Sequence, residues 1–328
     1  MVFKGKKILL IYAKFFNYDI IVRNKLLELG AEVDLYDGRA NLRPWEKALK
    51  KVYRGYYVLK QKRFHVEIQR MKKGENYDFI FSNTYLPAET IKGYRDVFPN
   101  AKMILYLDDS VANLKGVERT FCLYDKVATF DRLDALNYNV NLVPLFFSDD
   151  YNNKALSENN NYNYDICFVG TIHSDRLKII LDIDKQCEKN KLRFYNYCYL
   201  QSHFIYYYYL LTKKEFRKKP KSFFRFDQIS SEKVAEILSS SKSILDIQHP
   251  KQTGLTMRTI ETIGSQKKLL TTNEDVVNYD LFDERNIRVI DRQNPIVDID
   301  FINNDFHPLS DEIKSKYSTE GWLQQLFK

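Results

Sequence analysis

Short apolar runs alternate with stretches of helical spacing along the first half of the chain. Runs with the length and composition of buried strands occur at 6–13, 31–37, 77–83, 102–109, 125–131 and 142–147. Between the first two runs, apolar positions in residues 17–30 recur with the period of a helix, which we expect to end at Gly30. Strands separated by helices are joined by crossovers, which place neighbouring strands parallel. The first half therefore predicts an open α/β sheet.

The same pattern begins again after a polar, Asn-rich stretch at 148–164, whose composition is typical of a linker. Strand-like runs then occur at 165–172, 191–197 and 243–248, with helical spacing from about Ser174 and at 231–242. We predict two α/β domains in tandem. Their expected bounds are 1–150 for the N-terminal domain, 151–164 for the linker, 165–310 for the second domain and 311–328 for a C-terminal helical segment.

The charge and aromatic content of the chain favour anionic partners. Of its 328 residues, 44% are apolar and 29% are charged, which is a globular composition. The chain also has 24 Tyr and 22 Phe, and its net charge is +8. A positive balance of this kind favours nucleotide phosphates, membrane headgroups or nucleic acid as binding partners.

Several classes of protein are disfavoured by the sequence. The N-terminus lacks a long apolar region with a small-residue cleavage site, so we expect no signal peptide. The most lipid-like run, 204–211, is far shorter than the ~20 residues of a spanning helix. The 4 cysteines are scattered without a CxxC pair, so we expect them to stay reduced in the cytosol. The pair formed by Asp298 and Asp300 is too common a pattern to indicate a metal site.

The stretch QHPKQTGLTMRTIETIGSQKKLLTTN, residues 248–273, has the pattern of a ligand-binding loop and helix. A polar loop containing Gly254 follows an apolar run, and a short helix is predicted up to Gly264. Loops beyond the carboxyl ends of parallel strands bind ligands, and a helix N-terminus suits a phosphate. Arg258 and Glu261, one turn apart, offer a cation for a diphosphate and an acceptor for ribose hydroxyls. Helix spacing alone favours the alternative that they form an i,i+3 surface pair.

This stretch resembles the donor-binding segment of GT-B glycosyltransferases, especially a bacterial group linked to capsule and lipopolysaccharide synthesis. The similar segments follow the expected order over most of the chain: MILYLDDSVAN (103–113), YDKVATFDRLDA (124–135), LVPLFF (142–147), DICFVGTIHSDR (165–176) and GLTMRTIETIGSQKKLLTTN (254–273). The resemblance implies two Rossmann-like domains with parallel sheets that face an interdomain cleft. It assigns the acceptor to the N-terminal domain and the nucleotide sugar to the C-terminal one.

By this resemblance, Glu261 corresponds to the carboxylate that holds the ribose hydroxyls. The backbone of Gly254, Leu255 and Thr256 corresponds to the hydrogen-bond donors for the diphosphate. Many retaining members of the family have a second glutamate eight residues before the first one, where this chain has Thr253. Retaining and inverting transfer therefore both stay open.

A second glycine-containing turn, FVGTIHSDR, repeats this arrangement at the start of the second domain. Gly170 and Thr171 end a predicted strand, and Arg176 leads into the next helix, where its charge suits a leaving diphosphate. A solvated arginine in the first helical turn is the alternative. In the loop after 243–248, His249 is a candidate for contact with sugar or phosphate, or else it has a structural role in the loop.

In the first domain, Asp108 and Asp109 lie at the carboxyl end of the predicted strand 102–109. A carboxylate at this position is suited to act as the general base for an acceptor hydroxyl, which inverting transfer requires. The alternative is that the two aspartates cap the following turn. Asp19, near the start of the first helix, is a weaker second candidate.

Two segments, 45–73 and 204–226, interleave Lys and Arg with Tyr, Trp and Phe. Aromatic side chains at headgroup depth and cations beside anionic lipid would suit a membrane interface. The same chemistry would hold single-stranded nucleic acid by stacking and charge. A solvated helix with an aromatic core face is the structural alternative.

We therefore predict a cytosolic GT-B glycosyltransferase, peripherally associated with the inner face of the cytoplasmic membrane. It moves a sugar from a nucleotide-sugar donor to a growing cell-surface glycan such as capsule or lipopolysaccharide, without a metal or other cofactor. The expected partners are the donor, a glycan or lipid-linked acceptor and an anionic membrane surface, but no nucleic acid. The alternatives are a basic, non-catalytic nucleic-acid-binding protein and a nucleotide-sugar epimerase of the same two-domain shape.

Overall fold

The computed structural model describes residues 3–14, 17–43, 45–46, 53–149, 151, 162–250 and 252–328. Its contacts divide the chain into two compact units, the first made of residues 1–144 and 320–328 and the second of residues 145–319. Most of the predicted linker at 151–164 lies outside the described residues. The predicted C-terminal segment holds two helices, α12 (Asp311–Tyr317) in the second unit and α13 (Thr319–Phe327), which belongs to the first unit from Glu320 onward.

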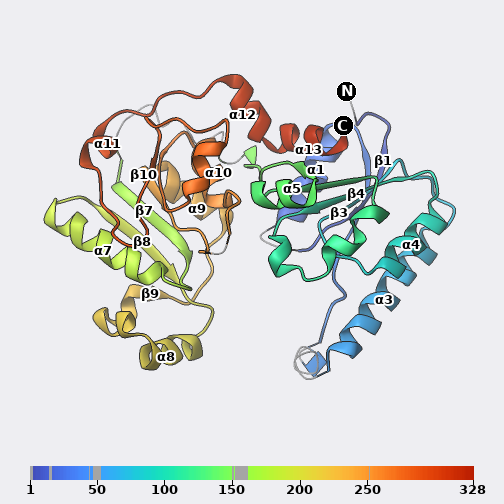
Figure 1. Ribbon diagram of the computed structural model, residues 1–328, viewed down its shortest axis with the longest axis horizontal. Coiled ribbons are helices and arrows are strands. Elements are labelled where there is room, and N and C mark those ends of the chain that lie inside the picture. The colour runs from blue at the N-terminus through green and yellow to red at the C-terminus, as the bar shows by residue number, and fades with distance from the viewer. Residues whose placement is uncertain are drawn as a thin grey trace. The chain divides into compact units, whose positions relative to one another are not determined.

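Parallel strands form a six-stranded sheet in the first unit (Figure 1). The strands are β1 (Lys7–Ile11), β2 (Glu32–Tyr36), β3 (Phe79–Ser82), β4 (Lys102–Leu107), β5 (Lys126–Thr129) and β6 (Asn141–Leu142). Their order is β2-β1-β3-β4-β5-β6, and every neighbouring pair is parallel. The described helices between them are α1 (Tyr18–Glu28), α3 (Arg54–Met71), α4 (Ala88–Val97) and α5 (Arg132–Tyr138), with 3-10 turns at Val111–Asn113 and Val117–Leu123.

The inner strands β1, β3 and β4 are mostly apolar because both faces of the sheet are covered there, whereas the outer strands β2 and β6 are more polar or exposed. Leu9 and Leu105 point to one face and cluster with apolar side chains of α3 and α4. Phe81 and Tyr106 have the opposite parity, and their rings contact Trp322 of α13 at centroid distances of 5.9 and 5.0 Å. The C-terminal helix is therefore part of the core of the first unit.

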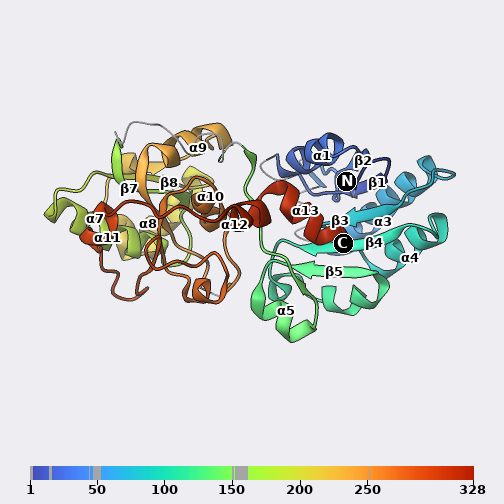
Figure 2. The same cartoon turned by 90° about the horizontal axis from the view of Figure 1, so that it is seen from above.

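The last helix also brings the two ends of the chain together in this unit (Figure 2). The ring of Phe327 lies 5.2 Å from the ring of Phe3, in an edge-on arrangement. Trp322 is fully buried. Since aromatic pairs of this kind contribute beyond their buried area, the end of the chain stabilises a sheet that the start of the chain builds.

A second six-stranded parallel sheet forms the other unit. Its strands are β7 (Tyr164–Thr171), β8 (Phe194–Tyr199), β9 (Phe224–Arg225), β10 (Ser241–Asp246), β11 (Lys268–Thr271) and β12 (Ile287–Val289). Their order is β12-β11-β10-β7-β8-β9, again with parallel neighbours. The helices are α7 (Arg176–Lys189), α8 (His203–Thr212), α9 (Ser231–Ser239), α10 (Met257–Gly264) and α11 (Ile299–Asn303), with α12 after them. The predicted pair of parallel α/β sheets is confirmed.

Two details of the predicted elements are wrong. The strand expected at 142–147 ends at Leu142, because Pro144 has no N–H to continue the ladder. Beyond it, Phe147 forms only an isolated bridge with Ser318. The helix expected from about Ser174 begins at Arg176, since Ser174 has a φ of 52°, outside the helical range.

The strand order fixes where each sheet can hold a ligand. In the second unit the chain builds outward from β7 to β9 and then returns to the other side of β7 with β10. The connections after β7 and β10 therefore run in opposite directions and leave a crevice beyond the carboxyl ends of these two strands. In the first unit the equivalent point lies between β1 and β3.

Two further points concern membrane-spanning helices and the acidic pair at 298 and 300. No helix in the described part of the chain is both long and apolar enough to cross a membrane. Asp298, from the acidic pair that we discounted as a metal site, caps α11 by accepting a hydrogen bond from the N–H of Phe301, and it also pairs with Arg288.

Candidate functional site

Arg176 bridges the carboxyl ends of the two strands at the switch point of the second sheet. As the first residue of α7, it donates from Nε to the carbonyl of Ile247, just beyond β10, at 2.6 Å. Its Nη1 donates to the carbonyl of Thr171, the last residue of β7, at 2.9 Å. Burial lowers the pKa of Arg176, although an arginine stays charged at neutral pH. The alternative of a fully solvated arginine is wrong, because the side chain is half-buried and bonded to both strands.

The charge of Arg176 is not compensated by a direct ion pair in the described part of the chain, where its partners are neutral carbonyl groups. Gly170 lies beside it, and a Cβ at this glycine would stand 3.6 Å from Nη1 of Arg176. A guanidinium whose positive charge remains available, at the switch point of a parallel sheet, has the charge and location that a phosphate group requires.

A buried aspartate ties the N-terminus of α10 to the end of β10. Oδ2 of Asp246 accepts hydrogen bonds from the hydroxyls of Thr256 and Thr259, both at 2.8 Å. The hydroxyl of Thr256 also accepts from the N–H of Thr259 at 3.1 Å, which makes Thr256 the N-cap of α10. From the sequence, only the backbone of Thr256 was predicted to belong to the site. The structure adds the side chain as the group that fixes where the helix begins.

The loop before α10 is held by a residue of the next strand connection. Nδ2 of Asn273 donates to the carbonyls of Thr253 and Gly254 at 3.0 and 3.3 Å. Gly254 is buried, and the side chain of Leu255 is fully buried. Two of the residues predicted to offer backbone donors are therefore immobilised by the core and by Asn273.

The two loops of the crevice meet through a pair of histidines. The rings of His173, from the loop after β7, and His249, from the loop after β10, lie 5.6 Å apart between centroids. Burial, helped by the charge of Arg176, lowers the pKa of His173 to about 4, so this imidazole is neutral at physiological pH. His249 thus has a structural neighbour in the loop, and its contact with a ligand stays a prediction.

A second arginine at this edge, Arg292, went unnoticed in the sequence. It pairs with both carboxylate oxygens of Asp175 at 2.7 and 2.8 Å, and it donates from Nη2 to the carbonyl of Gln248 at 2.9 Å. Nη1 lies 3.2 Å from the hydroxyl of Thr272. These partners follow β7, β10 and β11, so Arg292, which itself follows β12, cross-links four strand ends.

A cavity of about 450 Å³ opens beside this cross-link. Its lining residues come from the loops after β10 and β11 and from Arg292: Gln248, Pro250, Gln252, Thr253, Thr272, Asn273, Glu274, Asp275, Asn278 and Arg292. The lining is polar and made mostly of amides, hydroxyls and acids, a set that can hydrogen-bond the edges of a nucleoside.

Glu261 and Arg258 form an ion pair inside the protein, whereas helix spacing alone favoured a surface pair. Nη1 of Arg258 lies 2.7 Å from Oε2 of Glu261, and their side chains are only 17% and 7% exposed. The hydroxyl of Tyr151 donates to Oε1 of the same carboxylate at 2.8 Å. Both oxygens of this buried carboxylate therefore have partners within the second unit, one through a charge-assisted hydrogen bond and the other through a hydroxyl hydrogen bond.

In the first unit, the candidate aspartates differ in their partners. Asp109 accepts from the N–H of Ser110 and from Nδ2 of Asn113, both at 2.8 Å, so it caps the turn that follows β4. Asp108 accepts from Nδ2 of Asn83 at 2.8 Å, and Oδ1 of Asn83 accepts from the N–H of Ala13. Asn83, missed in the sequence, thus joins the carboxyl ends of β1, β3 and β4.

The Asp108 carboxyl group has an altered acidity. Desolvation by the surrounding protein raises its pKa to about 6, with a smaller contribution in the same direction from Asp109. The side chain nevertheless stays open to solvent. A carboxylate with this pKa is suited to accept a proton near neutral pH. Asp19, the weaker candidate, is buried in the first turn of α1.

Comparison with known proteins identifies the architecture. No protein-family model matches the sequence, and no curated protein matches it. HepE from Anabaena, solved with UDP-glucose, has a TM-score of 0.57 at 11% identity, over 98% of this chain and 95% of that one. The lipopolysaccharide outer core galactosyltransferase WaaB has a TM-score of 0.55 at 9% identity, over 97% of each chain. UDP-GlcNAc 2-epimerase from Methanocaldococcus jannaschii has a TM-score of 0.54 at 11% identity, over 97% of this chain and 98% of that one. At these identities the likeness is one of fold, and the chain has the GT-B fold, with two Rossmann-like units built on parallel six-stranded sheets.

Proposed function

We propose that this protein is a glycosyltransferase that binds a nucleotide-sugar donor at the switch point of its second sheet. The observation that carries the proposal is the half-buried Arg176, which joins the ends of β7 and β10 through neutral carbonyls and keeps its charge for an anion. The N-terminus of α10, fixed by the Thr256 cap, adds the positive end of a helix dipole. Together they are suited to bind a diphosphate.

Each group then has a chemical task in the transfer. The acceptor hydroxyl attacks the anomeric carbon, the bond from this carbon to the diphosphate breaks, and the diphosphate leaves with added negative charge. Arg176 stabilises this growing charge without a metal ion. Glu261 accepts from the ribose hydroxyls, which take the place of the Tyr151 hydroxyl, while Arg258 stays paired with the same carboxylate.

The backbone of Gly254, Leu255 and Thr256 lies at the start of α10, where N–H groups face a bound phosphate in the proposed complex. Gly170, Thr171 and His249 border the same crevice and are proposed donor contacts.

The first unit would present the acceptor. Asp108, held by Asn83 at the carboxyl edge of the sheet, takes the proton from the attacking hydroxyl if transfer inverts the anomeric centre. Asp109 is engaged in capping the following turn, so we assign it the role of fixing the backbone next to Asp108.

For the acceptor class we propose a cell-surface glycan such as capsule or lipopolysaccharide, built at the cytoplasmic face of the membrane. Similarity to the capsule and lipopolysaccharide group in the motif at 254–273 supports this choice. The basic charge of the chain supports an anionic membrane surface as a partner, with a glycan or lipid-linked acceptor.

An epimerase acting on a nucleotide sugar is the second candidate, because an enzyme of this activity has the same fold with a similar TM-score. It requires no acceptor, so product analysis separates the two. The alternative of a basic nucleic-acid-binding protein predicts oligonucleotide binding in place of nucleotide-sugar binding.

A screen of nucleotide sugars for protection against thermal unfolding tests the proposal. We expect one donor to stabilise the wild type, and Arg176→Ala to lose this effect. The matched control is Arg285→Ala, which removes an exposed arginine paired with Asp283 in the same unit. With the best donor, sugar transfer should need an acceptor and should continue in the presence of a chelator. A changed sugar without any acceptor would establish the epimerase instead. Stabilisation by oligonucleotides alone would refute both enzymatic functions.

A further inference from the structure

Helix α8 is apolar on all sides, and one of its faces carries a row of exposed apolar side chains. Phe204 is 80% exposed and Leu211 is 76% exposed, with Tyr207 and Tyr208 each about half exposed between them. These positions follow the spacing i, i+3, i+4, i+7 and so lie on one face of the helix. The opposite face packs through the buried Tyr206 into the core of the second unit. A helix with a second apolar face needs a second apolar surface to cover it.

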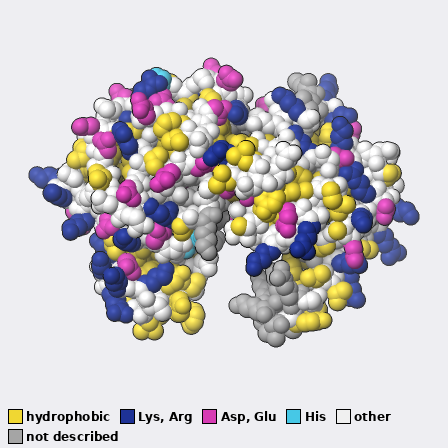
Figure 3. All heavy atoms as spheres, in the orientation of Figure 1, with side chains coloured by type: hydrophobic (Ala, Val, Ile, Leu, Met, Phe, Trp, Pro, Cys, Tyr) yellow, Lys and Arg dark blue, Asp and Glu magenta, His cyan; other side chains and the backbone are white. Residues whose placement is uncertain are grey.

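Cations surround this apolar row. Of residues 213–221, six are Lys or Arg: Lys213, Lys214, Arg217, Lys218, Lys219 and Lys221. One residue, Glu215, is acidic. Figure 3 shows the apolar side chains of this region gathered at the lower end of the view, with Lys and Arg side chains beside them. Only Lys219 forms an ion pair among these described residues, with Asp184 at 2.7 Å. The charges of Lys214, Lys218 and Lys221 therefore remain available at the surface.

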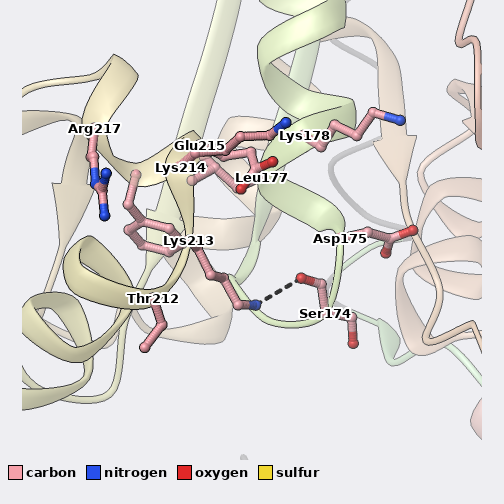
Figure 4. Close-up of a pocket in the computed structure, with 10 residues that line it drawn as sticks. Ser174, Asp175, Leu177, Lys178, Thr212, Lys213, Lys214, Glu215 and Arg217 are labelled. Atoms are coloured by element: carbon pink, nitrogen blue, oxygen red, sulfur yellow. Dashed lines mark hydrogen bonds between the residues drawn. The ribbon is translucent and has the colours of Figure 1, made fainter.

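The cations also border a cavity of about 570 Å³ between the start of α7 and the segment that follows α8. Lys178, Lys213, Lys214 and Arg217 are among its lining residues, and Figure 4 shows Lys213 reaching toward the backbone of Ser174. Its Nζ donates to this carbonyl at 3.0 Å. Asp175 and Glu215 also line the cavity, so four cations face two carboxylates and the net charge of the lining is positive. A positive cavity beside an apolar helix suits a negatively charged headgroup whose chains lie next to it.

The other basic-aromatic segment, in α3, is different. Three of its lysines pair with acids: Lys60 with Glu46 at 2.6 Å, Lys62 with Glu89, and Lys72 with Asp34 at 2.9 Å. Arg63, Arg70 and Lys73 are exposed. Residues 47–52 of that segment lie outside the described residues. Charges already neutralised within the protein attract a membrane weakly. A larger share of the cations is neutralised in this segment than in 213–221, where Lys219 pairs with Asp184, so the comparison favours α8.

We infer that α8 and residues 213–221 form a membrane-docking surface for anionic lipid, with α8 lying in the interface. Phe204 and Leu211 enter the boundary of the acyl chains, and the tyrosines lie at headgroup depth. Lys214, Lys218 and Lys221, which form no ion pair with an acid among the described residues, contact the headgroups. Nucleic acid is a weaker partner for this surface, because an aliphatic side chain such as Leu211 gains nothing from stacked bases. The inference names the surface for the membrane association included in the proposed function, but it does not require sugar transfer to occur.

Sedimentation with vesicles tests the inference on the full chain. One set contains phosphatidylcholine alone and the other contains added phosphatidylglycerol. We expect the wild type to bind only the anionic vesicles, and to be released by high salt. The variant Lys214→Gln/Lys218→Gln/Lys221→Gln should lose more than about tenfold in partitioning. Phe204→Ser/Leu211→Ser should lose binding at a similar level, because it removes the inserting side chains.

Controls in the first unit match each change. Lys73→Gln/Lys92→Gln/Lys115→Gln alters the net charge equally, and Leu59→Ser removes an apolar side chain that is 56% exposed on α3. Both controls should bind within about twofold of the wild type. Equal losses in controls and test variants, or no vesicle binding by the wild type, would overturn the inference, as would binding of this segment to oligonucleotides without binding to vesicles.

Nucleotide-sugar binding measured on the same variants reports separately on the proposed function, since every substituted residue lies outside the donor crevice.

Discussion

Removal of the Glu261 carboxylate should act on both stability and donor binding, since this group pairs with a charge inside the second unit. In Glu261→Ala, the guanidinium of Arg258, only 17% exposed, loses a carboxylate at 2.7 Å. Removing one partner of a buried ion pair costs about 3–5 kcal/mol, and the partial exposure of Arg258 favours the lower end, about 3 kcal/mol. For a unit of this size we expect the melting temperature to fall by about 6–12 °C.

The assay is chemical denaturation of the wild type, Glu261→Ala, Glu261→Gln, Arg258→Met and the double variant Glu261→Ala/Arg258→Met. Because the two side chains are in contact, the double-mutant cycle should show a coupling energy of about 1.5–3 kcal/mol. Glu261→Gln keeps an acceptor for the Tyr151 hydroxyl and should be less damaging than Glu261→Ala. Titration of the folded variants with the donor should show weaker binding by about 1.5–3 kcal/mol, the value of a hydrogen bond to a charged group.

The matched control is Glu236→Ala, because Glu236 forms an i,i+3 pair with Lys233 on the exposed face of α9 in the same unit. Such surface pairs are worth at most about 0.5 kcal/mol. If Glu261→Ala costs no more than this control, the pair is a surface pair after all and the reasoning is refuted. If a folded Glu261 variant binds the donor as tightly as the wild type, Glu261 does not contact the ribose.

Three further predictions concern single sites. Because the pKa of Asp108 is raised to about 6 and a general base must be ionised, turnover should fall as the pH drops through about 6. If Asp108 is the base, the pH–rate profile of a residually active Asp108→Asn variant should lack this fall on the acidic side. Gly264→Ala should cost about 1–3 kcal/mol in chemical denaturation, because its Cβ would stand 2.5 Å from the Phe147 ring, and Phe147→Leu should restore part of the loss. Burial acts to raise the pKa of Asp165, but hydrogen bonds from Arg193 prevail and lower this pKa from 3.8 to about 2. The stability that the Asp165 carboxylate contributes should therefore be present above pH 3.8 and be lost as the pH falls toward 2. Acid denaturation of Asp165→Asn should lack this loss.

Local patterns in the sequence were sufficient to predict two parallel α/β sheets, with β1 to β5 of the first and β7, β8 and β10 of the second, and the loops after β7 and β10. The strands β9, β11 and β12 were not predicted. Apolar runs report burial on both faces of a parallel sheet, and a glycine followed by a helix reports a turn at a strand end. Arg176 and the loop around Gly254 were predicted as site residues for these reasons, whereas the role of Glu261 was predicted from the family resemblance. The helix end at Gly264 was also predicted, but the ring of Phe147, which leaves no room for a Cβ at this position, is not revealed by the local sequence.

The contacts that complete the site join distant residues and left no local signal. Asp175 and Arg292 are 117 residues apart, and Tyr151 and Glu261 are 110 residues apart. Helix spacing thus could not show that the Arg258–Glu261 pair is buried. Arg292 follows β12, which was not among the predicted strands, so the rule that ligands bind beyond the carboxyl ends of parallel strands did not point to it.

Hydrogen–deuterium exchange with and without a nucleoside diphosphate tests the central claim most directly, because it locates the donor without requiring the acceptor. The proposed site predicts that the ligand slows exchange at the backbone amides of residues 172–176 and 252–258, the two loops joined by Arg176. Arg176→Ala should lose this protection, while Arg285→Ala should keep it. Protection confined to the first unit, or to segments away from the ends of β7 and β10, would contradict a donor site at the switch point of the second sheet.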